Sequence, residues 1–531
     1  MSSRRSLGRI AGIVGLATLL SKAIGLVRAT CVAAVFGVGA VAEAYNYAYI
    51  IPSFFLVLIG GLNGPLHTAL VSVLAKQSDR TTAEQISGTV SVIVTVILLP
   101  LTLAVMGFAD ILLTWVAPGL TAEIRAIAVP QLQVMAAMIL VSGWIGVSLG
   151  VLTAREQYWI PSISPALSSL AVIGSLAVFA WRSSVSSFSL EELTRIGGIT
   201  LAVGTLIGAI AQWALQSIVQ WRSGGHFRLL QGKWRSEGVG DVFKIMVPAT
   251  LSSGLMSINV YVDLLFASYI PKAAAALSYA ELLAQAPRGI LSSTLLVPLL
   301  PAFSRLAAPE QRSQLKAQIR QGLVLAALVS LPLSALLVGL AVPIVRVVYE
   351  RQAFDADASL LVAALLRIFG IGLFPSLVRD VLVRVFYGLG DGATPFRISL
   401  FNIGLNVVLD YWLVGWFSAS GLILSSLGIN LVAIGLLLIS LHRCLEGISW
   451  WNWSLPIFKI LSISLITSLM SWGVWQGCTL FLSPENWLIQ VLYLSLAVGL
   501  GLGFFGLMAW KSGLPEVRLL GNRFSRKAPQ K

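Results

Sequence analysis

Two cations, Lys22 and Arg28, lie inside an apolar stretch of the sequence that extends from residue 10 to residue 36. That stretch exceeds the roughly 20 residues that an α-helix needs to cross a bilayer. Because a cation at the centre of such a helix costs on the order of 3 kcal/mol, a helix surrounded by lipid would not keep two. The two residues are six positions apart, which places their side chains about 120° apart around the helix axis, so both can line one broad wall. We therefore predict that they line a polar cavity; snorkelling to the interface or structural ion pairing is the alternative.

The next apolar segment, residues 42–75, carries Glu43 near its start and Pro52 and Gly60-Gly61 further along. Pro52 lacks a backbone hydrogen-bond donor, so we predict a bent helix here. Broken membrane helices with buried polar groups border water-filled cavities rather than lipid. This segment is therefore also predicted to lie beside a cavity.

Side chains with oxygen atoms recur in apolar segments of the second half of the chain. Asn406 and Asp410 are four residues apart and hence on one helix face, while Asp263, Ser425 and Ser426 lie in other apolar segments. Two carboxylates, an amide and a hydroxyl could enclose a small hard cation through oxygen ligands. Hydrogen bonding between helices, or pairing of an aspartate with an arginine, would explain the same residues.

Other charged side chains also lie within apolar segments, among them Glu281 and Arg288, and the neighbours Arg379 and Asp380, which can satisfy each other. None of these is part of a catalytic arrangement. The three histidines have no motif partners, and the three cysteines lack the spacing of metal ligands. The sequence therefore favours a protein that is not an enzyme.

The amino-acid composition indicates that the elements which position these residues are membrane helices. Hydrophobic residues make up 57% of the 531-residue chain and charged residues 11%, against roughly 25% charged in soluble domains. The net charge of +14 comes from basic residues in short loops and at the termini, which is the pattern of membrane topology and not of nucleic-acid binding. It places both termini in the cytoplasm.

We predict an all-α polytopic membrane protein with about fourteen transmembrane helices. The apolar runs lie near residues 10–36, 42–75, 85–108, 126–153, 160–181, 197–221, 242–268, 274–304, 320–348, 358–388, 394–417, 420–442, 455–481 and 487–510.

A weak internal repeat divides these helices into two lobes around a central cavity. Arg155-Glu-Gln-Tyr-Trp-Ile-Pro161 resembles Gly390-Asp-Gly-Ala-Thr-Pro395, six helices later. We predict a six-helix lobe over residues 1–221, a basic cytoplasmic linker over 222–241, and a second six-helix lobe over 242–442. Residues 443–531 would add two helices and a basic cytoplasmic tail. Such repeats place a central site between the lobes.

The motifs resemble those of a known family, the MurJ/MviN lipid II flippases. Ser21-Lys-Ala-Ile-Gly-Leu-Val-Arg28 resembles the family's S-R-x-x-G-x-x-R pattern, and Phe386-Tyr-Gly-Leu-Gly-Asp-Gly-Ala-Thr-Pro395 resembles a second signature. The resemblance implies the fourteen-helix fold of the MOP exporter superfamily and a location in the bacterial plasma membrane. It implies movement of an undecaprenyl-linked peptidoglycan precursor, lipid II. The implied partners are that precursor, membrane lipids and cell-wall synthesis enzymes.

The resemblance also implies roles for particular residues. The residues expected to bind substrate are Lys22, Arg28, Glu43, Glu281 and Arg288. The residues expected to hold a sodium ion are Asp263, Asn406, Asp410 and Ser426. No cofactor is required, and coupling to sodium or to protons is expected.

Several positions depart from the family pattern. Lys22 and Glu43 replace an arginine and an aspartate, Leu56 stands where P-N-L-x-R has its arginine, and Leu282 replaces the arginine of Y-A-D-R-L. These losses keep alternatives open: a cation-coupled exporter of a drug or of another lipid-linked oligosaccharide, or a cell-wall scaffold without transport. A membrane glycosyltransferase should carry an acidic metal-binding motif on a large outer loop, and none is evident.

Overall fold

The computed structural model describes residues 7–62, 64–77, 79–185, 189–223, 237–256, 258–291, 296–481 and 486–517. These residues are almost entirely helical, and no strand occurs among them. Twelve of the described helices are long and apolar enough to cross a membrane. The prediction of an all-α polytopic membrane protein is confirmed, with fewer uninterrupted spans than the fourteen expected.

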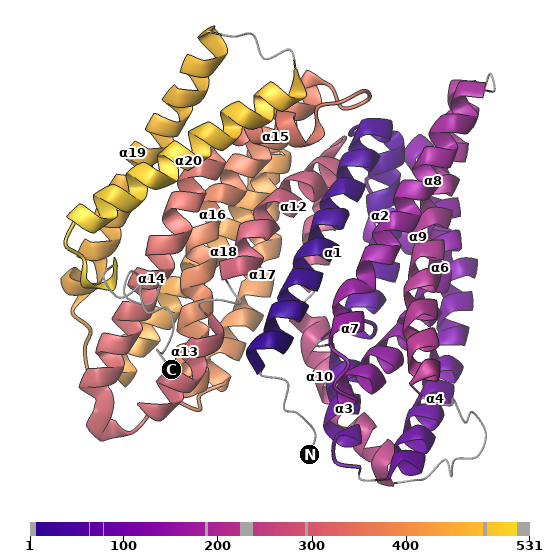
Figure 1. Cartoon of the computed structure of the whole chain (residues 1–531), viewed down its shortest axis with the longest axis horizontal. Coiled ribbons are helices and arrows are strands. Elements are labelled where there is room, and N and C mark those ends of the chain that lie inside the picture. The colour runs from indigo at the N-terminus through magenta and orange to yellow at the C-terminus, as the bar shows by residue number, and fades with distance from the viewer. Residues whose placement is uncertain are drawn as a thin grey trace. The chain divides into compact units, whose positions relative to one another are not determined.

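The helix bounds are α1 Leu7–Phe36, α2 Ala40–Leu58, α3 Pro65–Leu74, α4 Arg80–Gly107, α5 Ala109–Val116, α6 Ala122–Ala154, α7 Trp159–Ile163, α8 Pro165–Val185, α9 Leu190–Arg222, α10 Glu237–Met256, α11 Ile258–Ala267, α12 Ala273–Leu291, α13 Val297–Arg305, α14 Arg312–Gly339, α15 Ala341–Tyr349, α16 Ala356–Gly388, α17 Ala393–Phe417, α18 Ala419–Cys444, α19 Trp450–Phe481 and α20 Trp487–Lys511, with a 3₁₀ turn at Pro309–Gln311 (Figure 1).

Among the described residues, two of the predicted runs, 242–268 and 274–304, provide none of the twelve spans. The run 242–268 contains α10 and α11, and the run 274–304 contains α12 and α13. The run 42–75 contains α2, which is one of the twelve spans, and the shorter α3. The helix α2 continues through Pro52 to Leu58, so this proline does not end it, and the predicted bend at Pro52 stays a prediction. The interruption falls instead at the following glycines: a Cβ at Gly61 would collide with the carbonyl of Val57, so only glycine permits this backbone path.

The chain divides into two compact units, residues 1–275 with 351–354, and residues 276–350 with 355–531. In the first unit α6 is the central helix and packs against α2, α3, α4 and α9. Most of the predicted linker 222–241 lies outside the described residues, so the predicted lobe boundaries stay a prediction.

Small residues allow α6 to occupy the centre of the first unit. A Cβ at Gly146 would overlap the carbonyl of Ile59, and one at Gly150 would lie 2.7 Å from the Cβ of Leu70. Close packing of this kind is how membrane helices associate, because lipid gives them no hydrophobic driving force. The glycines of α6 thus fix where α2 and α3 lie against it.

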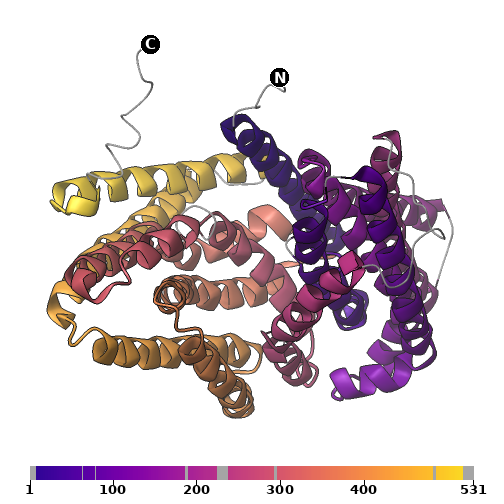
Figure 2. The same ribbon diagram turned by 90° about the horizontal axis from the view of Figure 1, so that it is seen from below.

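The second unit is built on α14, α16 and α18, with α17 packed against α18. The last two long helices, α19 and α20, pack together along the edge of this unit (Figure 2). Ser468 of α19 donates a hydrogen bond to the carbonyl oxygen of Ala335 in α14 at 2.7 Å, beside Gly339. A polar contact therefore ties α19 to the central helices of the unit.

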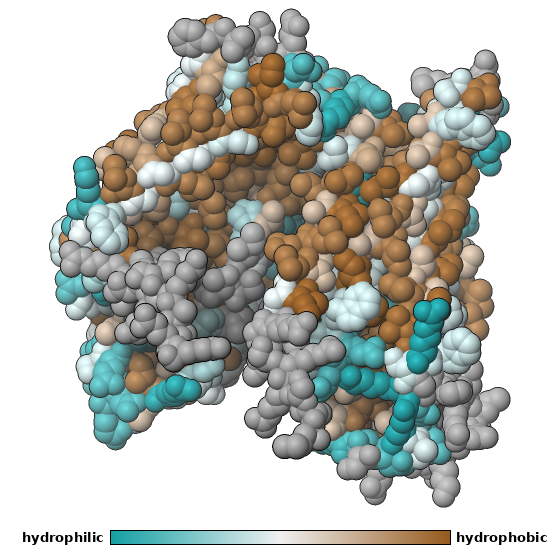
Figure 3. Space-filling view, viewed as in Figure 1, coloured by the Kyte–Doolittle hydropathy of each residue, from teal (hydrophilic) through white to brown (hydrophobic). Residues whose placement is uncertain are grey.

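Apolar side chains cover much of the outer surface of the helices, and hydrophilic ones gather toward helix ends (Figure 3). Exposed apolar side chains include Trp416, which is 80% exposed, and Trp115, which is 75% exposed. A soluble protein would bury such residues, whereas lipid tails solvate them. The surface is therefore that of a protein embedded in a bilayer.

Candidate functional site

Lys22 and Arg28 lie on α1, which packs against α8, α7 and α2 of the first unit. Lys22 is exposed and Arg28 is half-buried. Neither side chain forms a hydrogen bond or an ion pair with any residue that the structure describes. The two cations are therefore available to an external anion, as a substrate-binding role requires, and no described acid neutralises them structurally.

Glu43 is buried near the start of α2, with 3% of the residue exposed. Its carboxylate accepts hydrogen bonds from the backbone N–H groups of Ala274 at 3.2 Å and Ala275 at 2.9 Å. These groups belong to the first turn of α12, whose N–H donors have no partner within the helix. Glu43 thus caps α12 and places a negative charge at the positive end of the helix dipole. Its predicted contact with substrate stays a prediction.

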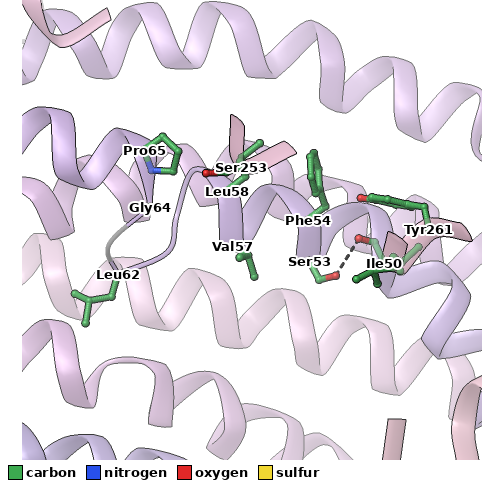
Figure 4. Close-up of a pocket in the computed structure, with 11 residues that line it drawn as sticks. Ile50, Ser53, Phe54, Val57, Leu58, Leu62, Gly64, Pro65, Ser253 and Tyr261 are labelled. Atoms are coloured by element: carbon green, nitrogen blue, oxygen red, sulfur yellow. Dashed lines mark hydrogen bonds between the residues drawn. The ribbon is translucent and has the colours of Figure 1, made fainter. Parts of the chain in front are cut away.

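The part of α2 that departs from the family pattern lines an apolar cavity of about 400 Å³ within the first unit (Figure 4). Phe54 and Val57 of α2 and Tyr261 of α11 form part of its wall. The Phe54 and Tyr261 rings meet edge to face with centroids 5.6 Å apart. The Ser53 hydroxyl donates to the carbonyl oxygen of Ile50 at 2.9 Å, so it is already used inside the helix. This cavity suits an apolar group.

Glu281 and Arg288 lie on α12, in the part of that helix that belongs to the second unit. Glu281 is exposed and accepts a hydrogen bond from Nε2 of Gln285 at 2.8 Å. The Nε atom of Arg288 is buried and has no hydrogen-bond partner among the described residues. The guanidinium therefore keeps donors for a further ligand, and its expected role in binding substrate stays a prediction.

Asn406 and Asp410 are fully buried on one face of α17. Nδ2 of Asn406 donates to Oδ2 of Asp410 at 2.7 Å and to Oγ of Ser425 at 3.3 Å. Ser425 belongs to α18, so this cluster joins two packed helices. The hydroxyl that reaches the cluster is that of Ser425, whereas the prediction had chosen its neighbour Ser426. Asp263 is half-buried on α11 of the first unit, and its role as an ion ligand stays a prediction.

A second polar network lies between α16 and α18. Nη2 of Arg379 donates to Oδ1 of Asp380 at 2.9 Å, and Nη1 donates to Oδ1 of Asn430 at 2.7 Å. Asn430 in turn donates to the backbone carbonyl oxygen of Ser426 at 2.7 Å. The two charges satisfy each other, as their adjacency suggested. Asn430 was not among the predicted residues. The only indication in the sequence is that a polar residue stands within an apolar run.

The turn between α16 and α17 contains the signature that ends at Pro395. Gly390 adopts a φ of 80°, and the N–H of Asp391 donates to the carbonyl oxygen of Phe386 at 2.9 Å, which closes α16. The Asp391 carboxylate accepts from the backbone N–H of Thr394 at 3.0 Å and from its hydroxyl at 2.6 Å. These bonds, led by that from the hydroxyl, lower the pKa of Asp391. Their stabilisation is present at neutral pH and is lost as the pH falls through that lowered pKa.

The same closing turn recurs at the end of α6. Glu156 has a φ of 61°, and the N–H of Gln157 donates to the carbonyl oxygen of Leu152 at 2.9 Å. In each of the two turns a proline follows five residues after the residue with positive φ, at Pro161 and at Pro395. The two turns that the internal repeat pairs therefore share one backbone geometry.

Comparison with known structures defines the class. A multidrug resistance transporter of the MATE family in the MOP superfamily, solved in an inward-facing conformation, matches with a TM-score of 0.64 at 13% identity, covering 82% of this chain and 98% of that one. A lipid II flippase MurJ in an inward closed conformation matches with a TM-score of 0.72 at 20% identity, covering 93% and 98%. The chain has the fold of these two membrane proteins.

Comparison of sequences identifies the family. The family model described as lipid II flippase MurJ matches residues 32–497. A probable lipid II flippase MurJ from Synechocystis is 46% identical over 99% of this chain and 98% of its own length. Another from Rhizobium tropici is 25% identical over 97% of this chain and 96% of its own. The chain belongs to the lipid II flippase MurJ family.

Proposed function

We propose that this chain moves lipid II, the undecaprenyl-pyrophosphate-linked peptidoglycan precursor, across the plasma membrane of a bacterium by alternating access. Membership of the MurJ family supports the substrate. The structural observation that carries the mechanism is the pair of cations on α1, which have no described hydrogen-bond or ion-pair partner inside a membrane helix. Both chain termini are proposed to lie in the cytoplasm.

Lys22 and Arg28 are proposed to hold the pyrophosphate of the substrate. Ammonium and guanidinium groups are donors only, and their charge-assisted hydrogen bonds to phosphate oxygens are the strong ones. Arg28 offers a planar set of donors that matches phosphate oxygens, whereas Lys22 acts as a compact charge. Arg288 is proposed as a further donor, because its buried Nε has no described partner.

Only the polar part of lipid II needs a protein path. The sugar and pyrophosphate would pay a large desolvation cost in lipid, whereas the polyprenyl chain already dissolves there. The proposed route therefore takes the head group past the α1 cations while the chain stays in the bilayer. The interruption between α2 and α3 supplies non-helical backbone, which membrane proteins tolerate beside protein or water.

Ion coupling is proposed at the cluster of Asn406, Asp410 and Ser425. A fully buried carboxylate is costly when charged, and a proton or a bound cation relieves that cost. The cluster carries carboxylate, amide and hydroxyl oxygens of the kind that a hard cation prefers, which makes these residues a suitable sodium-binding set. The alternative, supported by the bonds from Asn406, is a purely structural link between α17 and α18.

An exporter of drugs on the same fold is the second candidate, since the fold also matches a MATE transporter. Complementation separates the two. The chain is expressed in a bacterium whose own lipid II flippase can be switched off, and both growth and lipid II at the outer face are measured. Rescue of both supports lipid II transport. Drug resistance without rescue, in a strain lacking its drug exporters, would favour the second candidate.

A further inference from the structure

A cavity of about 600 Å³ with a basic lining lies within the second unit, beside the N-terminal ends of α14 and α19 and the C-terminal end of α20. Its wall comes from the start of α14, the loop before α19, the first turns of α19, and the residues after α20. It is separate from the α1 cations and from the cluster around Asp410. Neither the proposed transport step nor the sequence motifs use it.

Three cations line this cavity: Lys316 and Arg320 of α14 and Lys459 of α19. Nη1 of Arg320 donates to Oε1 of Glu516 at 2.9 Å, and its Nε donates to the carbonyl oxygen of Asn452 at 3.1 Å. Glu516 and Asn452 therefore hold the guanidinium in place, and its Nη2 atom has no bond to any described residue.

The charge around the cavity is unbalanced. Lys316 and Lys459 form no ion pair within the described structure, and Glu516 neutralises only Arg320. Lys316 and Arg320 are also four residues apart on one helix face, where like charges repel. A bound anion would relieve this repulsion and would find both lysines and the free end of Arg320 within one cavity.

The position of the cavity along the helices points to the headgroup layer of a membrane. Trp450 and Trp451 begin α19, Trp510 lies in the last turn of α20, and all three are exposed. Tryptophans at the ends of membrane spans mark the level of the lipid headgroups. A cavity between those same helix ends therefore opens at the depth where lipid phosphates lie.

An apolar path continues from the cavity along α19. Leu455 lines the cavity and is 40% exposed, and Phe458 is 59% exposed on the same helix. These side chains extend toward the apolar middle of α19, where the exposed Leu465 and Leu469 follow. A soluble phosphate compound would gain nothing from this surface, whereas acyl chains would cover it.

We propose that this cavity binds the phosphodiester headgroup of an anionic glycerophospholipid, with its acyl chains along the exposed face of α19. Lys316, Lys459 and Nη2 of Arg320 contact the phosphate oxygens. Basic pockets between membrane helices are suited to anionic headgroups for this reason. The site is thus a binding site for a structural lipid, distinct from the path of the transported substrate.

The test uses the purified full-length protein in detergent, with lipid added back. Phosphatidylglycerol, phosphatidylcholine and soluble glycerol 3-phosphate are compared by binding in native mass spectrometry and by the shift in unfolding temperature. The variants are Lys316→Gln/Lys459→Gln and, as control, Lys76→Gln, an exposed lysine of the first unit. Arg320 is left intact because it pairs with the buried Glu516.

We expect the wild type and Lys76→Gln to bind phosphatidylglycerol in preference to the other two probes, and the double variant to bind it roughly tenfold more weakly. Should the double variant fold poorly, the exposed Lys459→Gln alone is expected to weaken binding, and Lys459→Arg to restore it. Equal binding by wild type and double variant would overturn the proposal. So would equal binding of phosphatidylcholine, or displacement by glycerol 3-phosphate, which would indicate a soluble ligand.

Discussion

At the scale of the residue, the charged side chains within the helices of the first unit differ in whether they have a bonding partner. Glu43 is buried and its carboxylate accepts two backbone N–H groups at the start of α12. Lys22 and Arg28 have no described hydrogen-bond or ion-pair partner. The sequence indicated that all three were unusual in an apolar run, but residue type alone could not distinguish a cap from a ligand. That distinction depends on where Ala274 and Ala275, over 200 residues away, meet the carboxylate.

The capping role of Glu43 predicts a loss of stability when the carboxylate is removed. Glu43→Ala leaves two N–H groups of α12 without their acceptor, which should cost about 1–3 kcal/mol. We expect a clearly lower unfolding temperature of the purified protein. The control Glu123→Ala removes an exposed carboxylate of α6 and should leave the temperature nearly unchanged. Equal unfolding temperatures for both variants and wild type would show that the cap is unimportant.

At the scale of the element, helix existence could be predicted but helix interruptions could not. All fourteen predicted runs contain helix, because long apolar stretches have few other solutions in lipid. Pro52 predicted a bend and not the end of a helix, and α2 does continue through it. The break follows from glycines at which a Cβ would meet backbone, and such collisions depend on the packed structure. Ser425 and Ser426 were both candidates for the oxygen cluster, but the choice between them depends on which face of α18 packs against α17, and the sequence alone does not determine that face.

Gly146 of α6 provides a test of helix packing. Gly146→Ala places a methyl group against the carbonyl of Ile59 and should cost about 1–3 kcal/mol through overpacking. Gly174→Ala in α8 is the control, because no atom lies within 4 Å of its added Cβ. We expect a lower unfolding temperature for Gly146→Ala only. If both variants matched wild type, the close approach of α6 to this carbonyl would be contradicted.

The cluster between α17 and α18 predicts how sodium acts on stability. If Asp410 holds a cation, sodium should raise the unfolding temperature of the wild type and of the control Asp357→Asn, an exposed aspartate. It should have much less effect on Asp410→Asn. An equal sodium effect in all three proteins would remove the site. If sodium does not change the unfolding temperature of the wild type, and transport stops when the pH gradient is removed, the coupling ion is a proton.

At the scale of the whole molecule, the distribution of basic residues predicts an orientation that the fold alone does not give. Single cysteines at Ser184 and Glu310, in a chain without Cys31, Cys444 and Cys478, provide the measurement. With both termini in the cytoplasm, an impermeant thiol reagent should label Ser184→Cys in intact cells and Glu310→Cys only after permeabilisation. The reverse pattern would overturn the charge argument.

The central claim is that cations on α1 carry the pyrophosphate of lipid II. The most direct measurement is the amount of lipid II accessible at the outer face of cells whose own flippase is switched off. At equal protein levels, the wild type, Lys22→Arg and the control Arg195→Ala, an exposed arginine of α9, should restore this amount. Arg28→Ala should lower it at least about tenfold, because it removes charge-assisted bonds to phosphate. Lipid II at the outer face in Arg28→Ala cells at the wild-type level would contradict the claim.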